Sequence, residues 1–464
     1  MTATVTRMRV SIIGAGYVGL VTGVSAARDG HQVTFVERSA ERRQALRSGR
    51  VPIFEPGLQE GFEVARERIV IADQLEASAG PDLVLVAVGT PIGDDGTPDE
   101  SQLVAALEEL RQYPTVDTSI RSTLAPGRSV TLPRLLGRDD GRQISTNPEF
   151  LRQGTAMDDF ARPSRVVIGR FPETEAAHLL KVDSLHTGVT APRLLVDVSA
   201  AELIKNVANA FLALKLSFVN EVASLSEEYG VDVEQVLAGI GLDPRIGTAY
   251  MRPGLGFGGS CLPKELDVLS DAGRRRGLAM HIARAAAQVN GEQQDRFARR
   301  LLSELGAAPA RVGMLGLSFK PHTDDLRGSP AIRVIQRMLS AGHHVVAYDP
   351  AVSPEHARAA LPGLEFAARA EDVFESADAV AVATDWPEFA SLDLAALGTR
   401  MRHPILFDGR NLFDPAAVTA AGLRYRGIGR PDVGPAAPPG APQPADEADA
   451  TERSAAAVDG SSAV

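Results

Sequence analysis

The chain has 464 residues, of which 44% are hydrophobic and 23% charged, and its net charge is −11. This is the composition of an ordinary globular protein, in a chain too long for one core, so two or three domains are expected. The acidic balance and the lack of a basic stretch exclude a nucleic-acid partner. One cysteine excludes intrachain disulfides and indicates a reducing compartment. No apolar run approaches the roughly 18–20 residues of a membrane span, and the start lacks a signal-peptide pattern, so no membrane association and a cytoplasmic location are expected.

The last stretch, residues 431–464, has its own composition. It holds six acidic residues against one arginine, is rich in Pro, Ala and Ser, and has almost no large apolar side chains. Such a segment cannot bury enough surface to offset its chain entropy. We therefore predict a disordered tail with no part in the chemistry.

The first unit predicts a dinucleotide-binding domain. Residues 8–13 have the pattern of a buried strand, and Gly14-Ala-Gly-Tyr-Val-Gly19 and a helical stretch to about Asp29 follow. A second strand, residues 31–36, ends at Glu37. The glycines allow a pyrophosphate to approach the helix N-terminus, and the acid accepts hydrogen bonds from ribose hydroxyls. Because Glu37 would repel a 2′-phosphate, NAD is favoured over NADP.

Further strands of this domain end in polar residues. Thr90, Thr123 and Glu149 each follow an apolar or β-branched segment that indicates a strand. Ligands of open α/β sheets bind beyond the carboxyl ends of the strands, so these three side chains are expected to converge on one crevice.

The middle of the chain is predicted to be helical. Residues 199–229 show a long helical pattern with a serine N-cap and a closing glycine, and residues 265–305 are again helical. Lys205 and Asn209 are spaced i, i+4 on an otherwise apolar face, where a pair of donors suits a developing negative charge. Between the helices, Cys261 follows a run of four glycines that lets backbone pass close to a ligand. A lone cysteine becomes a candidate nucleophile only when partners are found.

A second α/β unit begins near residue 311. Residues 311–320 open a strand–turn–helix unit and further strand patterns follow at 344–349, 377–384 and 404–408, without a full G-x-G-x-x-G. Lys320, Arg327 and Arg410 lie near strand ends or loops, where they can neutralise a diphosphate. The nine histidines are scattered without ligand spacing, so no metal site is predicted.

The expected fold is therefore α/β, with two Rossmann-like doubly wound parallel-sheet domains joined by a long central helix and a helical middle domain. The predicted division is 1–198 for NAD, 199–300 for the helical part with the cysteine loop, 301–430 for the nucleotide sugar and 431–464 for the tail. The long apolar helix at 199–229 is a plausible homodimer surface.

Seven stretches together resemble the UDP-glucose/GDP-mannose dehydrogenase family, and its members that act on UDP-glucose match most closely. They run in family order from about residue 8 to 412: residues 14–20, 55–58, 88–91, 147–151, 201–205, 257–264 and 319–327. The resemblance implies a four-electron oxidation of a sugar primary alcohol to a carboxylate with two NAD. It thus implies conversion of UDP-glucose to UDP-glucuronate through a cysteine thiohemiacetal and thioester, with a nucleotide sugar as the chain's partner.

The resemblance also assigns roles to residues. By this resemblance, the catalytic residues of the chain would be Cys261, Lys205, Asn209, Glu149, Thr123 and Glu265. Its cofactor-binding residues would be Gly14, Gly16, Tyr17, Val18, Gly19, Glu37, Arg42, Thr90, Thr123, Gln153, Lys264 and Arg327. Its substrate-binding residues would be Glu149, Phe150, Leu151, Arg152, Lys205, Asn209, Tyr250, Met251, Arg252, Pro253, Gly254, Gly258, Lys320 and Arg410.

Three positions depart from the family pattern. Gln153 stands where a second glutamate is usual, Glu265 where aspartate is usual, and Gly328 where glutamate is usual. Because an amide cannot act as a base, the first departure favours Glu149 as the single base.

Two alternatives remain open at this point. One keeps the chemistry and changes the substrate to GDP-mannose or a UDP-N-acetylhexosamine. The other is a non-catalytic nucleotide-sugar sensor, against which the presence of Cys261 argues, since a sensor needs no thiol.

Overall fold

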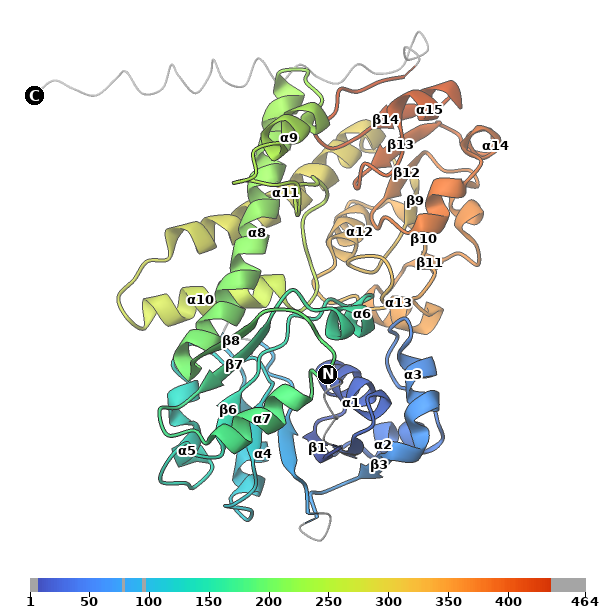
Figure 1. Cartoon of the computed structure of the whole chain (residues 1–464). Coiled ribbons are helices and arrows are strands. Elements are labelled where there is room, and N and C mark those ends of the chain that lie inside the picture. The colour runs from blue at the N-terminus through green and yellow to red at the C-terminus, as the bar shows by residue number, and fades with distance from the viewer. Residues whose placement is uncertain (1–6, 77–79, 94–96, 435–464) are drawn as a thin grey trace, which may run out of the picture.

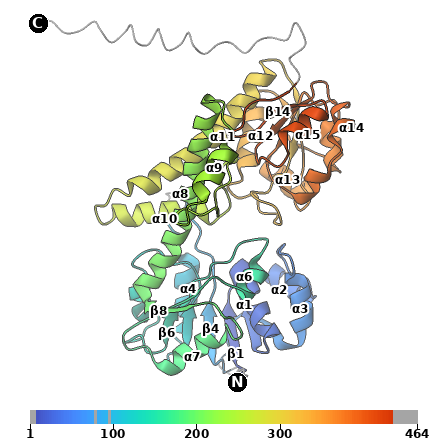
Figure 2. The same ribbon diagram turned by 45° about the horizontal axis from the view of Figure 1, so that its top comes forward.

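The structure is a computed structural model, and it describes residues 7–76, 80–93 and 97–434. Figure 1 shows an amino-terminal lobe, coloured blue to teal, and a carboxy-terminal lobe in orange and red, with the long helix α8 (Val198–Glu228) running between them. The same arrangement is visible from above in Figure 2. The predicted fold class is confirmed.

The amino-terminal lobe is built on a sheet of eight strands in the order β3-β2-β1-β4-β5-β6-β7-β8 among the described residues. All neighbouring strands are parallel except β6 and β7, which pair antiparallel. The strands are β1 (Arg9–Ile13), β2 (Gln32–Val36), β3 (Ile69–Ala72), β4 (Leu83–Val86), β5 (Thr118–Ile120), β6 (Ile144–Thr146), β7 (Val166–Arg170) and β8 (Arg193–Asp197).

Helices cover both faces of this sheet, as buried parallel strands require. The apolar run Leu83–Val86 is buried along its whole length: Leu83 and Leu85 pack into the core with α1, and Val84 and Val86 into the core with α4. The helices are α1 (Tyr17–Arg28), α2 (Ala40–Arg47), α3 (Leu58–Ala65), α4 (Ser101–Leu110), α5 (Leu132–Leu135), α6 (Ala156–Ala161) and α7 (Ala176–Ser184), with short 3₁₀ turns at Arg66–Arg68 and Ser129–Thr131.

Within the described residues, the carboxy-terminal lobe contains a second sheet, of six parallel strands in the order β11-β10-β9-β12-β13-β14. Its strands are β9 (Arg311–Leu315), β10 (His344–Tyr348), β11 (Glu365–Phe366), β12 (Ala379–Val382), β13 (Ile405–Asp408) and β14 (Arg424–Arg426). Its helices are α12 (Pro330–Ser340), α13 (Pro354–Ala360), α14 (Leu394–Gly398) and α15 (Pro415–Ala420), with 3₁₀ turns at Ala370–Phe374 and Pro387–Ser391.

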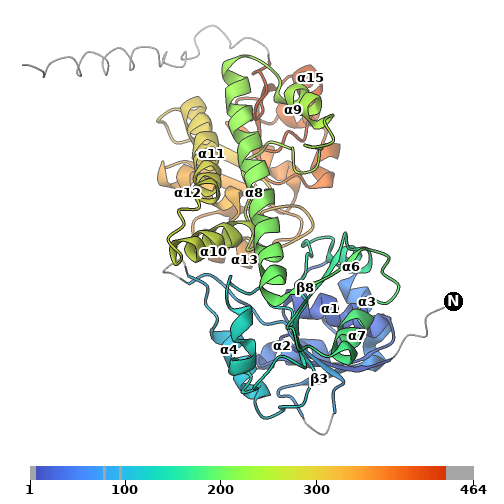
Figure 3. The same ribbon diagram turned by 60° about the vertical axis from the view of Figure 1, so that its left-hand side comes forward.

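Four helices form the middle of the molecule: α8, α9 (Val233–Gly241), α10 (Leu262–Arg274) and α11 (His281–Leu305). Figure 3 shows α8 reaching from the first sheet to the level of α9. The helix expected at 199–229 is thus present one residue earlier, flanked by Asp197 rather than capped by a serine side chain.

Two expectations were wrong in detail. The single helical stretch expected at 265–305 is broken at 275–280, where Gly277 has a φ of 76° and Met280 one of 46°. The predicted tail begins too early, because Val433 pairs with Tyr425 through its backbone and Asp432 forms ion pairs with Arg300 and Arg426. Residues 435–464 of that tail lie outside the described residues, and the predicted divisions at 198 and 300 stay predictions.

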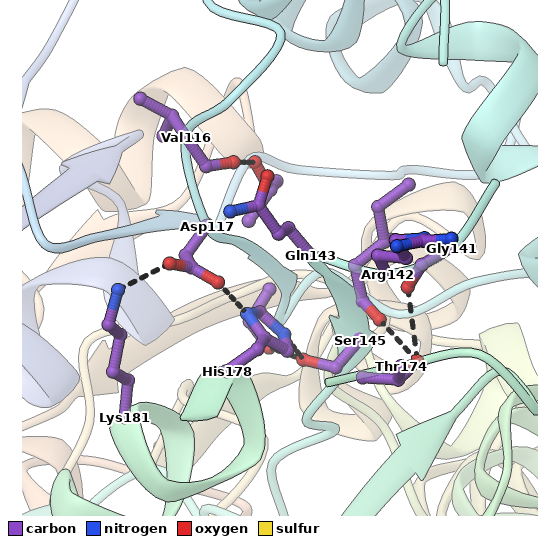
Figure 4. Close-up of polar contacts among 12 residues, drawn as sticks. Val116, Asp117, Gly141, Arg142, Gln143, Ser145, Thr174, His178 and Lys181 are labelled. Carbon is purple, nitrogen blue, oxygen red and sulfur yellow. Dashed lines mark hydrogen bonds and ion pairs between the residues drawn. The ribbon is translucent and has the colours of Figure 1, made fainter. Parts of the chain in front are cut away.

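The amino ends of β5 and β6 are fixed by a buried polar network (Figure 4). His178 bridges Asp117, at 2.6 Å, and the hydroxyl of Ser145, at 2.9 Å, while Lys181 pairs with the other oxygen of Asp117. Burial would raise the pKa of Asp117, but the hydrogen bonds from His178 and Lys181 hold it below its usual range. This Ser-His-Asp arrangement is closed to solvent, and Ser145 donates to Ser119, so the network stabilises the sheet.

Candidate active site

The loop between β1 and α1 has the shape that a dinucleotide needs. A Cβ at position 19 would lie 2.0 Å from the carbonyl oxygen of Gly14, so only glycine permits this close helix–strand packing. At Gly16 a Cβ would meet nothing within 4 Å, which leaves open space beside the first turn of α1. That turn has no side-chain cap, so its N–H groups are available to a pyrophosphate.

Glu37, which follows β2, reaches back to this loop. Its carboxylate accepts hydrogen bonds from the N–H groups of Ala15, at 3.0 Å, and Ser39, at 2.8 Å, and Arg42 lies 4.0 Å away. The acid therefore stands beside the glycine loop, as the ribose of NAD requires. These features fit the cofactor that the sequence predicts.

A cavity of about 760 Å³ lies where β6, α6, α8, the cysteine loop and the second sheet meet. The predicted residues that line it are Glu149, Phe150, Leu151, Arg152, Gln153, Lys205, Asn209, Tyr250, Arg252, Gly254, Gly258, Cys261, Lys320 and Arg410. Segments more than 250 residues apart in sequence thus share one site.

The remaining predicted residues lie outside this cavity lining. Met251 and Pro253 are buried. Thr90 donates to the backbone carbonyl of Thr123 and accepts from Lys264, at 2.7 Å, so these three form a contact between the first sheet and α10. Arg327 is held by Asp325 through two side-chain nitrogens.

An ion pair forms the centre of the cavity wall. The Lys205 ammonium lies 3.0 Å from Glu149, and both side chains are less than a tenth exposed. Burial opposes both charges, but each charge stabilises the other, so the pKa of Glu149 is lowered and that of Lys205 is raised. The second oxygen of Glu149 accepts from the N–H of Leu151. Asn209, one turn along α8, lines the same cavity.

Cys261 stands at the N-terminus of α10, with its side chain exposed to the cavity. The surrounding protein desolvates the thiol and raises its pKa, whereas Lys205 lowers it. Partial positive charge at a helix N-terminus also favours a thiolate. Glu265, in the first turn, is buried, its pKa is raised by burial, and one of its oxygens has no hydrogen-bond partner.

The far end of the cavity is cationic. Arg410 donates only to backbone carbonyls, those of Ala383, Gly256 and Phe319, and it has no carboxylate partner among the described ion pairs. Desolvation lowers the pKa of Lys320, which also lines this end. Two such cations suit a diphosphate.

The sequence did not identify several other residues that line the cavity. They are chiefly Arg121, Asn147, Phe160, Arg165, His186 and Phe319. Arg121 directly precedes the Ser-Thr pair at the end of β5, but only its burial in the folded chain distinguishes it from an ordinary surface arginine.

A dinucleotide loop on one sheet and a shared cavity against a second sheet define an NAD-dependent dehydrogenase. The chain also matches the models of the three domains of one family, described as "UDP-glucose/GDP-mannose dehydrogenase family": the NAD binding domain at residues 8–186, the central domain at 199–292 and the UDP binding domain at 313–415. The chain belongs to this family.

Individual relatives are consistent with this family assignment. A UDP-glucose 6-dehydrogenase of Rhizobium meliloti strain 1021 is 38% identical over 446 residues, which cover 92% of this chain and all of the relative. The solved structure of a UDP-glucose dehydrogenase from Pyrobaculum islandicum has a TM-score of 0.82 at 35% identity and covers 93% of this chain and 99% of that one. A UDP-D-ManNAc dehydrogenase from Pyrococcus horikoshii has a TM-score of 0.81 at 29% identity, covering 92% and 100%.

Within the part of the chain that the structure describes, no cluster of three or more His, Cys, Asp or Glu side chains is placed to hold a metal ion. In the same part, no helix combines the length and apolar character needed to cross a bilayer.

Proposed function

We propose that this protein oxidises UDP-glucose to UDP-glucuronate with two NAD per turnover. The observation that carries the proposal is the convergence of Cys261, Lys205 and Glu149 on one cavity whose other end holds Arg410 and Lys320. The thiol and the ion pair suit oxidation of a primary alcohol beyond the aldehyde, and the two cations suit a nucleoside diphosphate.

The proposed steps use the chain's own groups. NAD supplies the hydride acceptor in both oxidations. In the first, the alcohol loses its proton and a hydride and becomes an aldehyde. The Cys261 thiolate then adds to the aldehyde carbon, and the thiohemiacetal loses a second proton and hydride to become a thioester. Water attacks the thioester, the carbon–sulfur bond breaks, and the carboxylate and thiolate are released.

We assign to Lys205 and Asn209 the stabilisation of the oxyanions that develop at the addition steps. Glu149 is the proposed base that takes a proton from the hydrolytic water, because its lowered pKa keeps it ionised at neutral pH. A lysine beside it compensates the buried charge. We propose Thr123 and Glu265 as helpers and Thr90, Lys264, Gln153 and Arg327 as cofactor contacts.

The proposal also includes a homodimer through α8. Its exposed face carries a stripe of large apolar side chains, which are Leu203, Val207, Phe211, Phe218 and Leu225. Contiguous exposed apolar surface of this kind is typical of an interface.

Counting NADH per sugar tests the function. Purified protein is given NAD with UDP-glucose, GDP-mannose, UDP-N-acetylglucosamine or UDP-N-acetylmannosamine, the last because of the similarity to the Pyrococcus structure. Two NADH and one UDP-glucuronate per UDP-glucose are expected. One NADH per sugar would contradict the thioester route, and no turnover with any sugar would favour a sensor.

A further inference from the structure

Arg121 is a buried cation that the proposed chemistry leaves unused. It follows β5, lines the floor of the cavity and is only 3% exposed. Burial lowers its pKa to about 10, so it is still protonated at neutral pH. None of the ion pairs among the described residues includes it. A buried charge without a direct counter-charge is costly, and structures retain one where it serves a purpose.

The contacts of Arg121 join three elements beside the ion pair. Its Nε donates to Thr22 of α1 at 2.8 Å, a terminal nitrogen donates to both oxygens of Asn147, and the guanidinium lies 5.5 Å from the ring centre of Phe160 in α6. Thr22 belongs to the helix that begins at the cofactor loop. Arg121 therefore connects that helix to the end of β6.

Asn147 extends these contacts toward Glu149. It is buried, its backbone N–H donates to Ile120, its side-chain amide donates to Val167 at 2.8 Å, and His186 lies 3.2 Å from its side-chain oxygen. Burial lowers the pKa of His186 to about 3, so this ring is neutral and adds no charge. Only Pro148 separates the fixed Asn147 from Glu149.

We propose that Arg121 is a positioning residue for Glu149: Arg121 fixes the Asn147-Pro148-Glu149 segment and supplies, beside Lys205, a second positive charge that keeps this carboxylate ionised. The proposal rests on the proposed role of Glu149 as the base for hydrolysis. In agreement with it, the Arg121 charge acts on Glu149 to lower its pKa.

Other charged or titratable groups also face Glu149 and enter any titration. They are Lys205 of α8, Tyr17 of α1, and Cys261, Lys264 and Glu265 at the start of α10. None of them changes in an Arg121 variant, so a change in the pH profile reports the loss of the guanidinium.

The experiment compares Arg121→Gln and Arg121→Lys with wild type. UDP-glucuronate formation at saturating NAD and UDP-glucose is measured from acidic to neutral pH. Without the positive charge the pKa of Glu149 rises, so the acid limb of kcat should move to higher pH in Arg121→Gln by roughly half a unit or more. Arg121→Lys keeps the charge and should keep the wild-type limb, even at a lower rate.

Arg138→Gln is the matched control. Arg138 is a desolvated arginine at the opposite end of the same strands, and it donates to the backbone carbonyls of Tyr113, Val116 and Gln143. Its loss should lower the melting temperature without moving the acid limb. If Arg121→Gln loses rate equally at every pH, as a purely structural residue would, the proposal is overturned.

Asn147→Asp provides a second route if Arg121→Gln does not fold. An aspartate would neutralise Arg121 in place and should move the acid limb in the same direction, and an unmoved limb would again overturn the proposal. The wild-type assay distinguishes failure of this proposal from failure of the proposed function. If wild type itself yields no UDP-glucuronate, the proposed function is wrong, and the result does not count against the role of Arg121.

Discussion

At the scale of single residues, the thiol is the group whose loss is easiest to predict. Cys261→Ser replaces a thiol with a hydroxyl, which ionises far less readily and is a weaker nucleophile, and serine is also the poorer leaving group in hydrolysis. Steady-state formation of UDP-glucuronate should fall by several orders of magnitude, measured by NADH release and product analysis. The variant should melt as wild type does, because the side chain is exposed to the cavity. Acid production at the wild-type rate would mean that the thiol is structural.

The buried ion pair predicts a second result. Lys205→Met leaves the Glu149 carboxylate buried without its partner, which typically costs about 3–5 kcal/mol of folding free energy. Urea unfolding of the two proteins at neutral pH measures this. The double variant Lys205→Met with Glu149→Gln should recover part of the loss, and no recovery would show that the cost comes from packing.

The pH dependence of that stability has a definite sign. In wild type the pKa of Glu149 is lowered. The ionised carboxylate therefore stabilises the fold above the ordinary pKa of about 4.5, and this stabilisation is lost as pH falls through the lowered pKa. In Lys205→Met burial dominates and the pKa of Glu149 rises. In that variant Glu149 stabilises the fold in acid, and this stabilisation is lost as pH rises. The slope that Glu149 contributes to the free energy of unfolding against pH therefore reverses its sign.

At the scale of elements, the exposed stripe on α8 predicts assembly. Phe211 and Phe218 are both more than half exposed and lie two turns apart on one face of the helix. Phe211→Asp places a charge in the proposed interface and should shift a dimer to monomer in sedimentation at micromolar concentration. Val64→Asp, at an exposed apolar position of α3, is the matched control and should leave the dimer intact. A monomeric wild type would contradict the homodimer.

The elements differ in how well the sequence predicts them. The ends of α8 were predicted within one residue, because its pattern is long and Gly230 closes it. The break after α10 was missed, because Arg274 and its neighbours favour a helix and only Gly277 marks a turn. β7 runs antiparallel to β6, and strand direction leaves no mark in the local pattern.

The site shows the same difference. Glu149 was expected at a crevice because parallel strands carry ligand residues at their carboxyl ends, and it lines the cavity, whereas Thr90 and Thr123, expected there for the same reason, lie outside its lining. Arg121 and His186 were not found, because their signal is burial beside an ion pair, which exists only after distant segments meet. A local sequence window contains a residue's type, but not its charge environment.

At the scale of the whole molecule, contacts between distant segments bring the parts of the chain together. Lys205 meets Glu149, Lys264 meets Thr90, and Gln153 donates to Asp325 across 172 positions at 3.1 Å. The last of these joins the two lobes directly. Gln153, one of the three residues that depart from the family pattern, therefore lies at the junction between the lobes.

Gln153→Glu tests this junction. It would set two carboxylates against each other, and like charges at this distance ionise together only at a cost. The KM for NAD should rise several-fold, and more at pH 8 than at pH 6, where the pair can share a proton. Gln112→Glu, at an exposed position, is the control for added charge. An unchanged KM across this range would show that the contact does not support cofactor binding.

The end of the described chain supplies the last prediction. Asp432 pairs with Arg300 of α11 and with Arg426 of β14, and the backbone of Val433 bonds to that of Tyr425 in the same strand. A chain cut after residue 434 keeps these contacts, whereas one cut after residue 430 loses them. The shorter chain should therefore melt a few degrees lower, while the longer one melts with the full-length protein.

Asp432→Asn in the full chain separates the two contributions, since it removes the ion pairs and keeps the backbone contact. Its melting temperature should fall between those of the two truncated chains, because surface ion pairs contribute little and the strand-like backbone contact remains. Equal melting of the two truncated chains would mean that β14 holds its place without the segment that follows it, and that the fold ends at residue 430 as the sequence had suggested.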